Sequence, residues 1–381
     1  TPTEESAAPN VNISTSFGNF YDVGSTGMKI NYLASLDYSN SWDINRIERN
    51  TFVPSSVGLD IQEDLDVVNT ENSIDLSGIF SAGFTSVALR QTDDRVFQTA
   101  GETLDAPDLS TTELQWVERE ILSNQLQGDH YFPAFNELVI NWRYSDIIAT
   151  REAPDTRSYR YDGGEFSSRV DGNMRSFDIL EDNASELGID LTMVLYGPRN
   201  SIITPKLGYV SSEKERESEI RRFGFAFNGS IANDNQLLLR PLEEILSPEN
   251  ITEKGFVIRE LTRPTDSYRA NNSLEAFYGQ VEFNFDDRLR LTFGGRQEDF
   301  EQVTTTFDLF RPSASVVADL SRKEFLPAFS ATYIHYDHQF RFAYSETVSR
   351  PDFRELSMSP FINPETGREI FGNPNLDITS I

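Results

Sequence analysis

Apolar and polar residues alternate with a period of two in one segment after another of this chain. In FRFAYS, residues 340–345, two phenylalanines and a tyrosine alternate with an arginine, an alanine and a serine. Residues 28–38, 138–144 and 277–285 repeat the pattern. Because a strand places successive side chains on opposite faces, this period predicts β-strands. We count roughly twelve of about ten residues each, so the predicted fold class is all-β.

The connections between these strands are alternately short and long. The short ones lie at 22–27, 128–136, 197–201, 285–288 and 336–339. The long polar ones lie at 40–72, 92–112, 146–186, 212–273, 298–324 and 349–381. About ten residues suffice for a tilted strand to cross a bilayer. Tight periplasmic turns opposite long extracellular loops are typical of outer-membrane proteins, so the pattern predicts an antiparallel transmembrane β-barrel.

A soluble β-sandwich, propeller or β-helix is the competing architecture, since its strands alternate too. A propeller or β-helix would repeat its sequence at a fixed period, and we find no such repeat. Connections of 30 to 60 residues are also uncommon inside a compact soluble domain. Both observations favour the membrane barrel.

Charge and composition exclude several function classes. The chain has 33 basic and 61 acidic residues, for a net charge of −28. Such a chain is poorly suited to nucleic acid or to a polybasic membrane anchor. It contains no cysteine and three histidines, which leaves no thiolate metal site and little material for a histidine site. We therefore expect no metal, no cofactor and no nucleic-acid partner.

Catalysis is not expected either. With 61 acids in 381 residues, adjacent carboxylates such as Asp286–Asp287 and Asp93–Asp94 arise by chance, most often in turns. The glycine pair at 294–295 stands within a predicted strand, where it relieves crowding rather than cradling a phosphate. The chain is predicted not to be an enzyme.

The C-terminal third carries a specific combination of motifs. It reads LPAFSATYIHYDHQFRFAYSETVSRPDFREL from Leu326, followed by FGNPNL from Phe371. With these motifs the chain resembles the TonB-dependent receptors, and more narrowly the subgroup typical of Xanthomonas and Caulobacter relatives. The similarity covers about residues 112–376, and the first hundred residues fit only in pattern. The motif residues are Leu326, Pro327, Arg350, Pro351, Gly372, Asn373, Pro374, Asn375 and Leu376.

This resemblance implies a barrel of about 22 strands whose lumen is filled by an N-terminal plug. Residues 1–381 are then expected to be part of the barrel domain, roughly 12 of its strands. The N-terminal plug and the C-terminal closing strands are expected to be absent from this chain. The resemblance also implies the outer membrane of a Gram-negative bacterium, contact with its lipid, and energy from the TonB–ExbB–ExbD complex acting through the plug.

The implied activity is uptake of a scarce small solute. An oligosaccharide is the first expectation, a siderophore (ferric chelate) the second, and a passive porin or adhesion barrel the third. Aromatic rings beside carboxylates and amides are a common surface for sugars. Packing among the loops' own aromatic side chains is the alternative role. The candidate ligand-binding residues, all in predicted extracellular loops, are Trp42, Tyr159, Tyr161, Phe166, Phe307, Phe310, Arg350, Asp352 and Phe361.

The strand at 340–345 gives an expected orientation for the whole sheet. The tight turn at 336–339 places Phe340 at the periplasmic end, with Phe340, Phe342 and Tyr344 toward lipid and Arg341 toward the lumen. Because proline lacks a backbone donor, Pro351 marks where strand pairing loosens. Arg350 and Asp352 are expected either near the ligand path or in a local ion pair that ends the strand.

Overall fold

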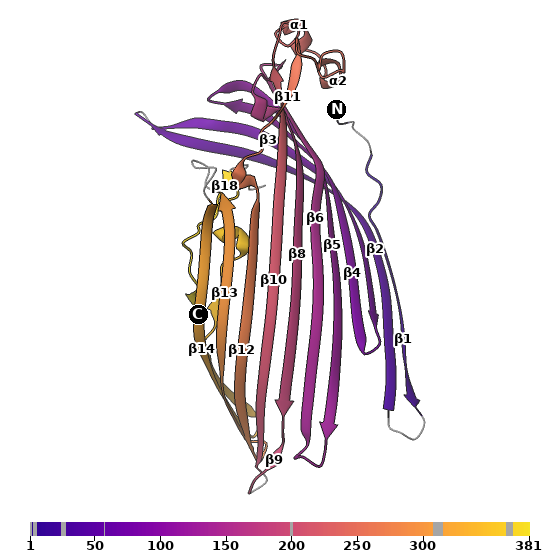
Figure 1. Cartoon of the computed structure of the whole chain (residues 1–381), viewed down its shortest axis with the longest axis vertical. Helices are drawn as coiled ribbons and strands as arrows, with labels where there is room; N and C mark the ends of the chain where they lie inside the picture. Colours follow the sequence, from indigo (N-terminus) through magenta and orange to yellow (C-terminus); the bar gives the residue numbers. More distant parts are fainter. Residues whose placement is uncertain are drawn as a thin grey trace.

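The computed structural model describes residues 2, 6–23, 28–56, 58–198, 201–307, 315–362 and 369–381. Most of them belong to one antiparallel sheet, in which each long strand pairs with its neighbours in the sequence (Figure 1). The strands along its main path are β1 (Val11–Val23), β2 (Met28–Ser55), β3 (Gly58–Ser81), β4 (Phe84–Thr103), β5 (Ala106–Phe132), β6 (Leu138–Asp162), β8 (Met174–Thr192), β10 (Ile202–Phe227), β12 (Tyr268–Phe285), β13 (Leu289–Phe307), β14 (Ser315–His335) and β15 (His338–Ser345).

Shorter elements surround this sheet. The strands β7 (Glu165–Phe166), β9 (Leu195–Tyr196) and β11 (Phe256–Glu260) pair with β6 or β10. The helical turns are η2 (Val170–Gly172), α1 (Asn235–Leu238), α2 (Leu242–Ile245), η3 (Pro264–Asp266) and α3 (Phe353–Leu356). Two small ribbons follow β15, formed by β16 (Val348–Ser349) with β19 (Thr379–Ser380) and by β17 (Phe361–Ile362) with β18 (Glu369–Ile370).

The predicted all-β class and the predicted twelve strands are confirmed along this path, but the predicted strand length is wrong. The strands of the main path from β2 to β14 have 18 to 28 residues rather than about ten. The segments 40–72 and 92–112, predicted as long loops, are hairpins of paired strand. Much of 146–186, 212–273 and 298–324 is strand as well. In these stretches both faces carry polar residues, so alternation disappears although the backbone hydrogen bonds continue.

One predicted turn shows how the hairpins close. Asp286 and Asp287, between β12 and β13, have φ of 48° and 54°. Left-handed conformations at both central residues are what a tight hairpin turn requires, and aspartate tolerates them. The side-chain amide of Asn284 donates to Asp287 at 2.8 Å. The acidic pair is therefore a turn, as predicted.

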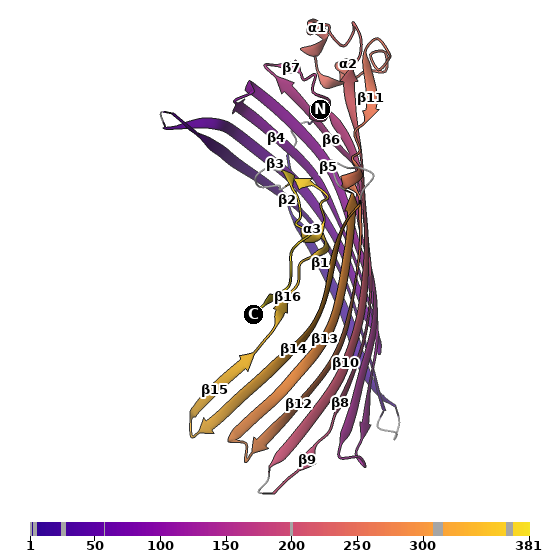
Figure 2. The same ribbon diagram turned by 60° about the vertical axis from the view of Figure 1, so that its left-hand side comes forward.

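The two faces of the sheet differ in chemistry. Opposed residues in antiparallel strands share a face, so the register assigns every position. We call inner the face that carries Gln302 and Thr306, because these residues bond the chain after β15. Figure 2 shows α3 and β16 on this concave side. The opposite, outer face carries the aromatics of β12–β15, including Phe293, Phe329 and Phe342, which contact one another across strands. The predicted grouping of Phe340, Phe342 and Tyr344 on that face, with Arg341 opposite, follows from the register.

A small cap lies at the end of the sheet opposite the β12–β13 turn (Figure 1). We call cap the residues 228–255, between β10 and β11, which contain α1 and α2 (Figure 1). Its core joins Ile245 and Phe256 to Tyr159 and Phe166 from the β6–β7 hairpin. Burying these rings against one another holds the cap on β6 and β10 without disulfides.

Candidate functional site

The chain after β15 folds back onto the inner face. We call strap the described part of residues 346–381. The two ends of the strap meet in the β16–β19 ribbon, where the backbone groups of Thr347 and Ile381 exchange hydrogen bonds of 3.0 and 2.8 Å. A segment whose ends are paired in this way forms a closed loop. The residues between the two ends therefore lie together on the inner face of the sheet.

Near its beginning the strap contains the short helix α3, which starts at a capping box. The Asp352 carboxylate accepts from the backbone N–H of Arg354 at 2.9 Å, and the Glu355 carboxylate accepts from that of Asp352 at 2.8 Å. Two otherwise unpaired donors at the helix start are satisfied by this exchange. The acidic residues of the RPDFREL motif therefore have a local structural role.

The GNPNL motif closes the other end of α3. The backbone N–H groups of Gly372 and Asn373 donate to the carbonyls of Ser357 and Glu355, at 2.9 and 2.6 Å. A Cβ added at Gly372 would lie 2.3 Å from the Ser357 oxygen, so only glycine fits there. The two motifs, separated by the fifteen residues 357–371, thus form one structural unit.

Ion pairs and ring contacts fasten this unit to three strands. Asp352 pairs with Arg216 of β10 at 3.3 Å, and Arg216 binds Asp182 of β8 at 2.6 Å. Arg350 pairs with Glu298 of β13 and lies over the ring of Phe300, 4.6 Å from its centre. Both predicted residues therefore have ion-pair partners on the inner face, but these partners are distant in the sequence and are not the local pair expected at the end of the strand.

A further contact ties the strap to β14. Arg322 donates to Asp377 at 2.5 Å, and this hydrogen bond lowers the pKa of the Asp377 carboxyl. Because both side chains are exposed, water screens the pair and its contribution to stability is small. The position of the strap rests mainly on α3, whose side chains Phe353 and Leu356 are buried.

Asp352→Ala is expected to loosen the strap in the full-length protein. Losing the cap of a short helix costs about 1–2 kcal/mol. The exposed pair with Arg216 adds less. Hydrogen exchange of residues 353–361 measures the change. Asp352→Asn is the matched control, because its side-chain oxygen still caps α3, and it should exchange nearly as slowly as the parent. Equal exchange in Asp352→Ala and the parent would contradict this role.

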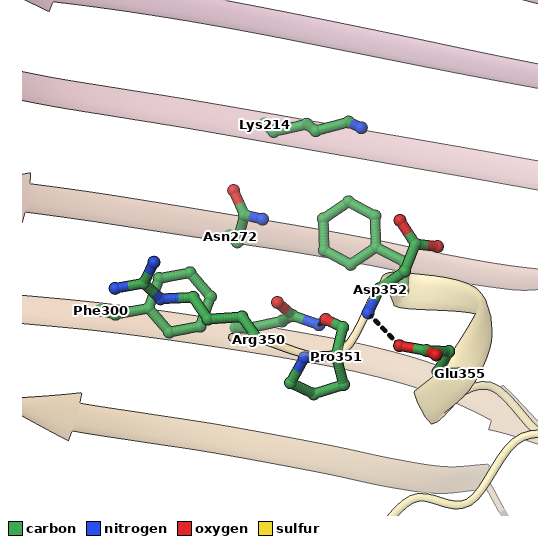
Figure 3. Close-up of a pocket in the computed structure, with 9 residues that line it drawn as sticks. Lys214, Asn272, Phe300, Arg350, Pro351, Asp352 and Glu355 are labelled. Carbon is green, nitrogen blue, oxygen red and sulfur yellow. Dashed lines mark hydrogen bonds between the residues drawn. The ribbon is translucent and has the colours of Figure 1, made fainter. Parts of the chain in front are cut away.

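A cavity of about 330 Å³ lies at the seam between strap and wall (Figure 3). Strands β10, β12 and β13 form one side and the start of the strap forms the other. Its lining combines amides, paired charges and the edges of two phenylalanine rings. The lining residues are Lys214, Asn272, Phe300, Gln302, Arg350, Pro351, Asp352, Phe353 and Glu355.

Of the predicted ligand residues, Arg350 and Asp352 line this cavity. Tyr159, Tyr161 and Phe166 come together elsewhere, in and against the cap core, with Phe166 only 2% exposed. Their rings pack edge-to-face, Tyr161 against Phe166 with centres 5.7 Å apart. These three residues therefore pack among the loop aromatics, which is the alternative role considered for them.

The remaining predicted residues lie apart. Trp42 is in β2 on the outer face, not in a loop as predicted, because the hairpin continues to Ser55. Phe361 lies in β17, where the guanidinium of Arg354 is 3.9 Å from its ring centre. Phe307 ends β13, but its side chain and the whole of Phe310 fall outside the described residues.

Sequence reasoning missed Lys214, Asn272 and Gln302 as parts of a site. All three fall in segments predicted as loops, 212–273 and 298–324. One signal could have found them. In its own strand, each residue lies a whole number of two-residue steps from the inner positions nearer the turn. Both faces of the strands are polar in these segments, so the sequence shows no period of two that would distinguish the inner from the outer positions.

Across the described ranges, no three histidine or acidic side chains are grouped as a metal site. No helix among those residues is long and apolar enough to cross a bilayer. Buried charges on the inner face are instead paired with one another, as in Asp93, which is held by Arg95 and Arg119.

Comparisons with known proteins place the chain in a family. Among solved structures, the siderophore receptor PiuA from Acinetobacter baumannii is similar at a TM-score of 0.43 and 11% identity, over 97% of this chain and 52% of that one. The chain thus spans about half the length of that receptor. No curated sequence matches. A family model described as TonB dependent receptor-like, beta-barrel matches residues 10–380. Since that match covers nearly the whole sequence, the chain belongs to the TonB-dependent receptor β-barrel family.

Proposed function

We propose that this chain forms part of the wall of an outer-membrane barrel. The observation that carries the proposal is an apolar band on the outer face. In β12 its outer positions run from Phe277 to Phe285, about 27 Å along the strand, and the next outward residue is Glu275. Outer-membrane barrels carry an apolar band of about 25 Å. The band adjoins the turn between β12 and β13, so the turns at that end of the sheet would face the periplasm.

The register extends this band across neighbouring strands. Tyr209 opposes Phe277, Val281 opposes Phe293, and Phe293 opposes Phe329. Beyond the band the outer positions of β10 become Glu213, Glu215 and neighbouring acids, which require water. Residues 1–381 are therefore proposed to be part of the barrel domain, completed by a plug and by closing strands encoded outside this sequence.

We propose energised uptake as the activity of the whole receptor. Family membership supports this, because the TonB–ExbB–ExbD complex would act on the plug and the wall described above would surround it. The finer assignment to the Xanthomonas and Caulobacter subgroup rests on the Arg350–Pro351 and GNPNL motifs. The two motifs occur together in the sequence, and together they form the helix α3 and the hydrogen bonds at its two ends.

An oligosaccharide is the ligand we propose, with a ferric chelate as the second candidate. The inner face supports a hydroxyl-rich solute, since its amides and carboxylates are groups that hydrogen-bond sugars. Arg350 and Asp352 remain our proposed ligand-contacting residues, because they line the seam cavity. The aromatics buried in the cap are no longer proposed for this role.

Cells producing the full-length receptor are expected to accumulate labelled oligosaccharide, and to stop when TonB is deleted. Energised transport needs the plug to be moved, whereas a passive porin or an adhesion barrel does not. The measurement is uptake of labelled oligosaccharides and ferric chelates with and without TonB. A strain with an empty vector gives the background. Uptake that persists without TonB would contradict the proposal and favour a porin.

A further inference from the structure

The seam cavity is built from two parts that are independent in the sequence. Lys214, Asn272 and Gln302 project from three adjacent strands, while Arg350 and Glu355 belong to the strap (Figure 3). Its volume of about 330 Å³ is at the lower end for ligand pockets. A molecule bound there would contact both the strands of the sheet and the strap, so residues from both would determine what binds.

Three of the four charged side chains that line the seam are already compensated by ion pairs, and the fourth, Glu355, is an acid. Lys214 binds Asp182 at 3.2 Å, and Asp352 binds Arg216 at 3.3 Å. Arg350 is likewise paired with Glu298. An anionic ligand would lose its hydration without gaining a free counter-charge, which is unfavourable. This arrangement therefore selects against anionic sugars and anionic chelates.

Hydrogen-bonding capacity is nevertheless left over. The Asn272 amide has no hydrogen-bond partner among the described residues, and it offers two donors and an acceptor. The Glu355 carboxylate uses one oxygen for the backbone N–H of Asp352. Within the described chain its other oxygen is unpaired. A hydroxyl both donates and accepts, so neighbouring hydroxyls can satisfy both side chains at once.

Each of the two aromatic rings at the seam already has a cation beside it, so face-on stacking of a ligand would compete with these cations. Arg350 covers Phe300, and the cations of Lys214 and Arg216 lie 5.6 and 5.4 Å from the ring centre of Phe353. A ligand at the seam would thus be held by hydrogen bonds and would rest against ring edges. Such a site suits a compact polyol better than a flat aromatic ligand.

We propose that the seam is a subsite for one neutral, hydroxyl-rich sugar unit, with Asn272 and Glu355 as its hydrogen-bonding residues. The proposal rests on the function proposed above and narrows it to uncharged glycans. It also assigns the strap to ligand contact, in addition to its structural role.

The test uses the purified full-length receptor and calorimetric binding of neutral xylo-, malto- and galacto-oligosaccharides, with oligogalacturonate and ferric citrate as charged probes. At least one neutral glycan is expected to bind and oligogalacturonate is not. Asn272→Ala should weaken neutral binding about tenfold, the effect of losing a hydrogen bond in a site. The control is Asn271→Ala, the neighbouring amide on the outer face, which should bind as the parent does.

Two further readouts separate the possible failures. Asn272→Asp keeps the shape but loses the donors, and it should also weaken neutral binding. Heat-modifiable gel mobility checks that each variant is folded. Equal affinities for Asn272→Ala and Asn271→Ala would overturn the subsite while leaving oligosaccharide uptake intact. Binding of only oligogalacturonate or ferric citrate, or of none of the neutral glycans, would overturn the neutral-sugar assignment. Loss of TonB-dependence in uptake concerns the proposed function alone.

Discussion

Phe293→Arg is expected to block assembly of the full-length receptor into the outer membrane. Phe293 lies on the outer face at the middle of the apolar band, beside Val281 and Phe329. Its ring is 49% exposed and contacts Phe329 with centres 4.9 Å apart. An arginine facing lipid at the bilayer midplane costs about 2–4 kcal/mol. The folded fraction is measured by heat-modifiable mobility in outer-membrane preparations, and by urea unfolding in lipid vesicles.

Thr292→Arg is the matched control for this variant. Thr292 is the preceding residue of β13, and it faces inward opposite Glu282 and Ser330. The same new side chain would there meet a polar, charged surface, and a change within about 0.5 kcal/mol is expected. If both variants assemble equally well, or both fail equally, the assignment of the outer face to lipid is wrong.

Phe256→Ala is expected to open the cap. The ring is fully buried, with centres 5.0 Å from Phe227 and 6.0 Å from Phe166. Removing a buried phenylalanine costs about 3–5 kcal/mol. Because the ring belongs to the small core that joins the cap to the β6–β7 hairpin, most of this loss should appear as local opening rather than as unfolding of the sheet. Limited proteolysis of the full-length receptor should then cleave within residues 228–255.

Leu239→Ala serves as the control in the same segment. That side chain is 59% exposed, so its removal leaves no cavity, and the cleavage rate should stay close to that of the parent. Ligand binding at the seam should survive Phe256→Ala, since the cap core shares no residue with the seam lining. Cleavage of Phe256→Ala at the parent rate would mean that the cap is held by other contacts.

The order and antiparallel pairing of the strands were accessible from the sequence. Turns as short as Phe285–Arg288 leave two adjacent strands no other way to pair. Likewise, the grouping of Phe340, Phe342 and Tyr344 on one face follows from the period of two alone. The family motifs at Arg350–Pro351 and Gly372–Leu376 pointed to the same barrel that the family match supports.

The site was predicted far less well. Arg350 and Asp352 were identified, but their partners Glu298 and Arg216 lie 52 and 136 residues away. Tyr159, Tyr161 and Phe166 were expected at a ligand surface because exposed and packed aromatics look alike in a sequence. Only the arrival of Ile245 from the cap and of Phe256 from β11 buries them.

The sequence by itself determined the fold class, the strand order and the aromatic outer face. These follow from local period and turn length, which each segment carries within about ten residues. Tertiary structure alone decided how far the strands continue past the apolar band, where the strap docks and which loop aromatics become core. Each of these depends on contacts between segments far apart in the chain, and no local pattern specifies which segment will meet which.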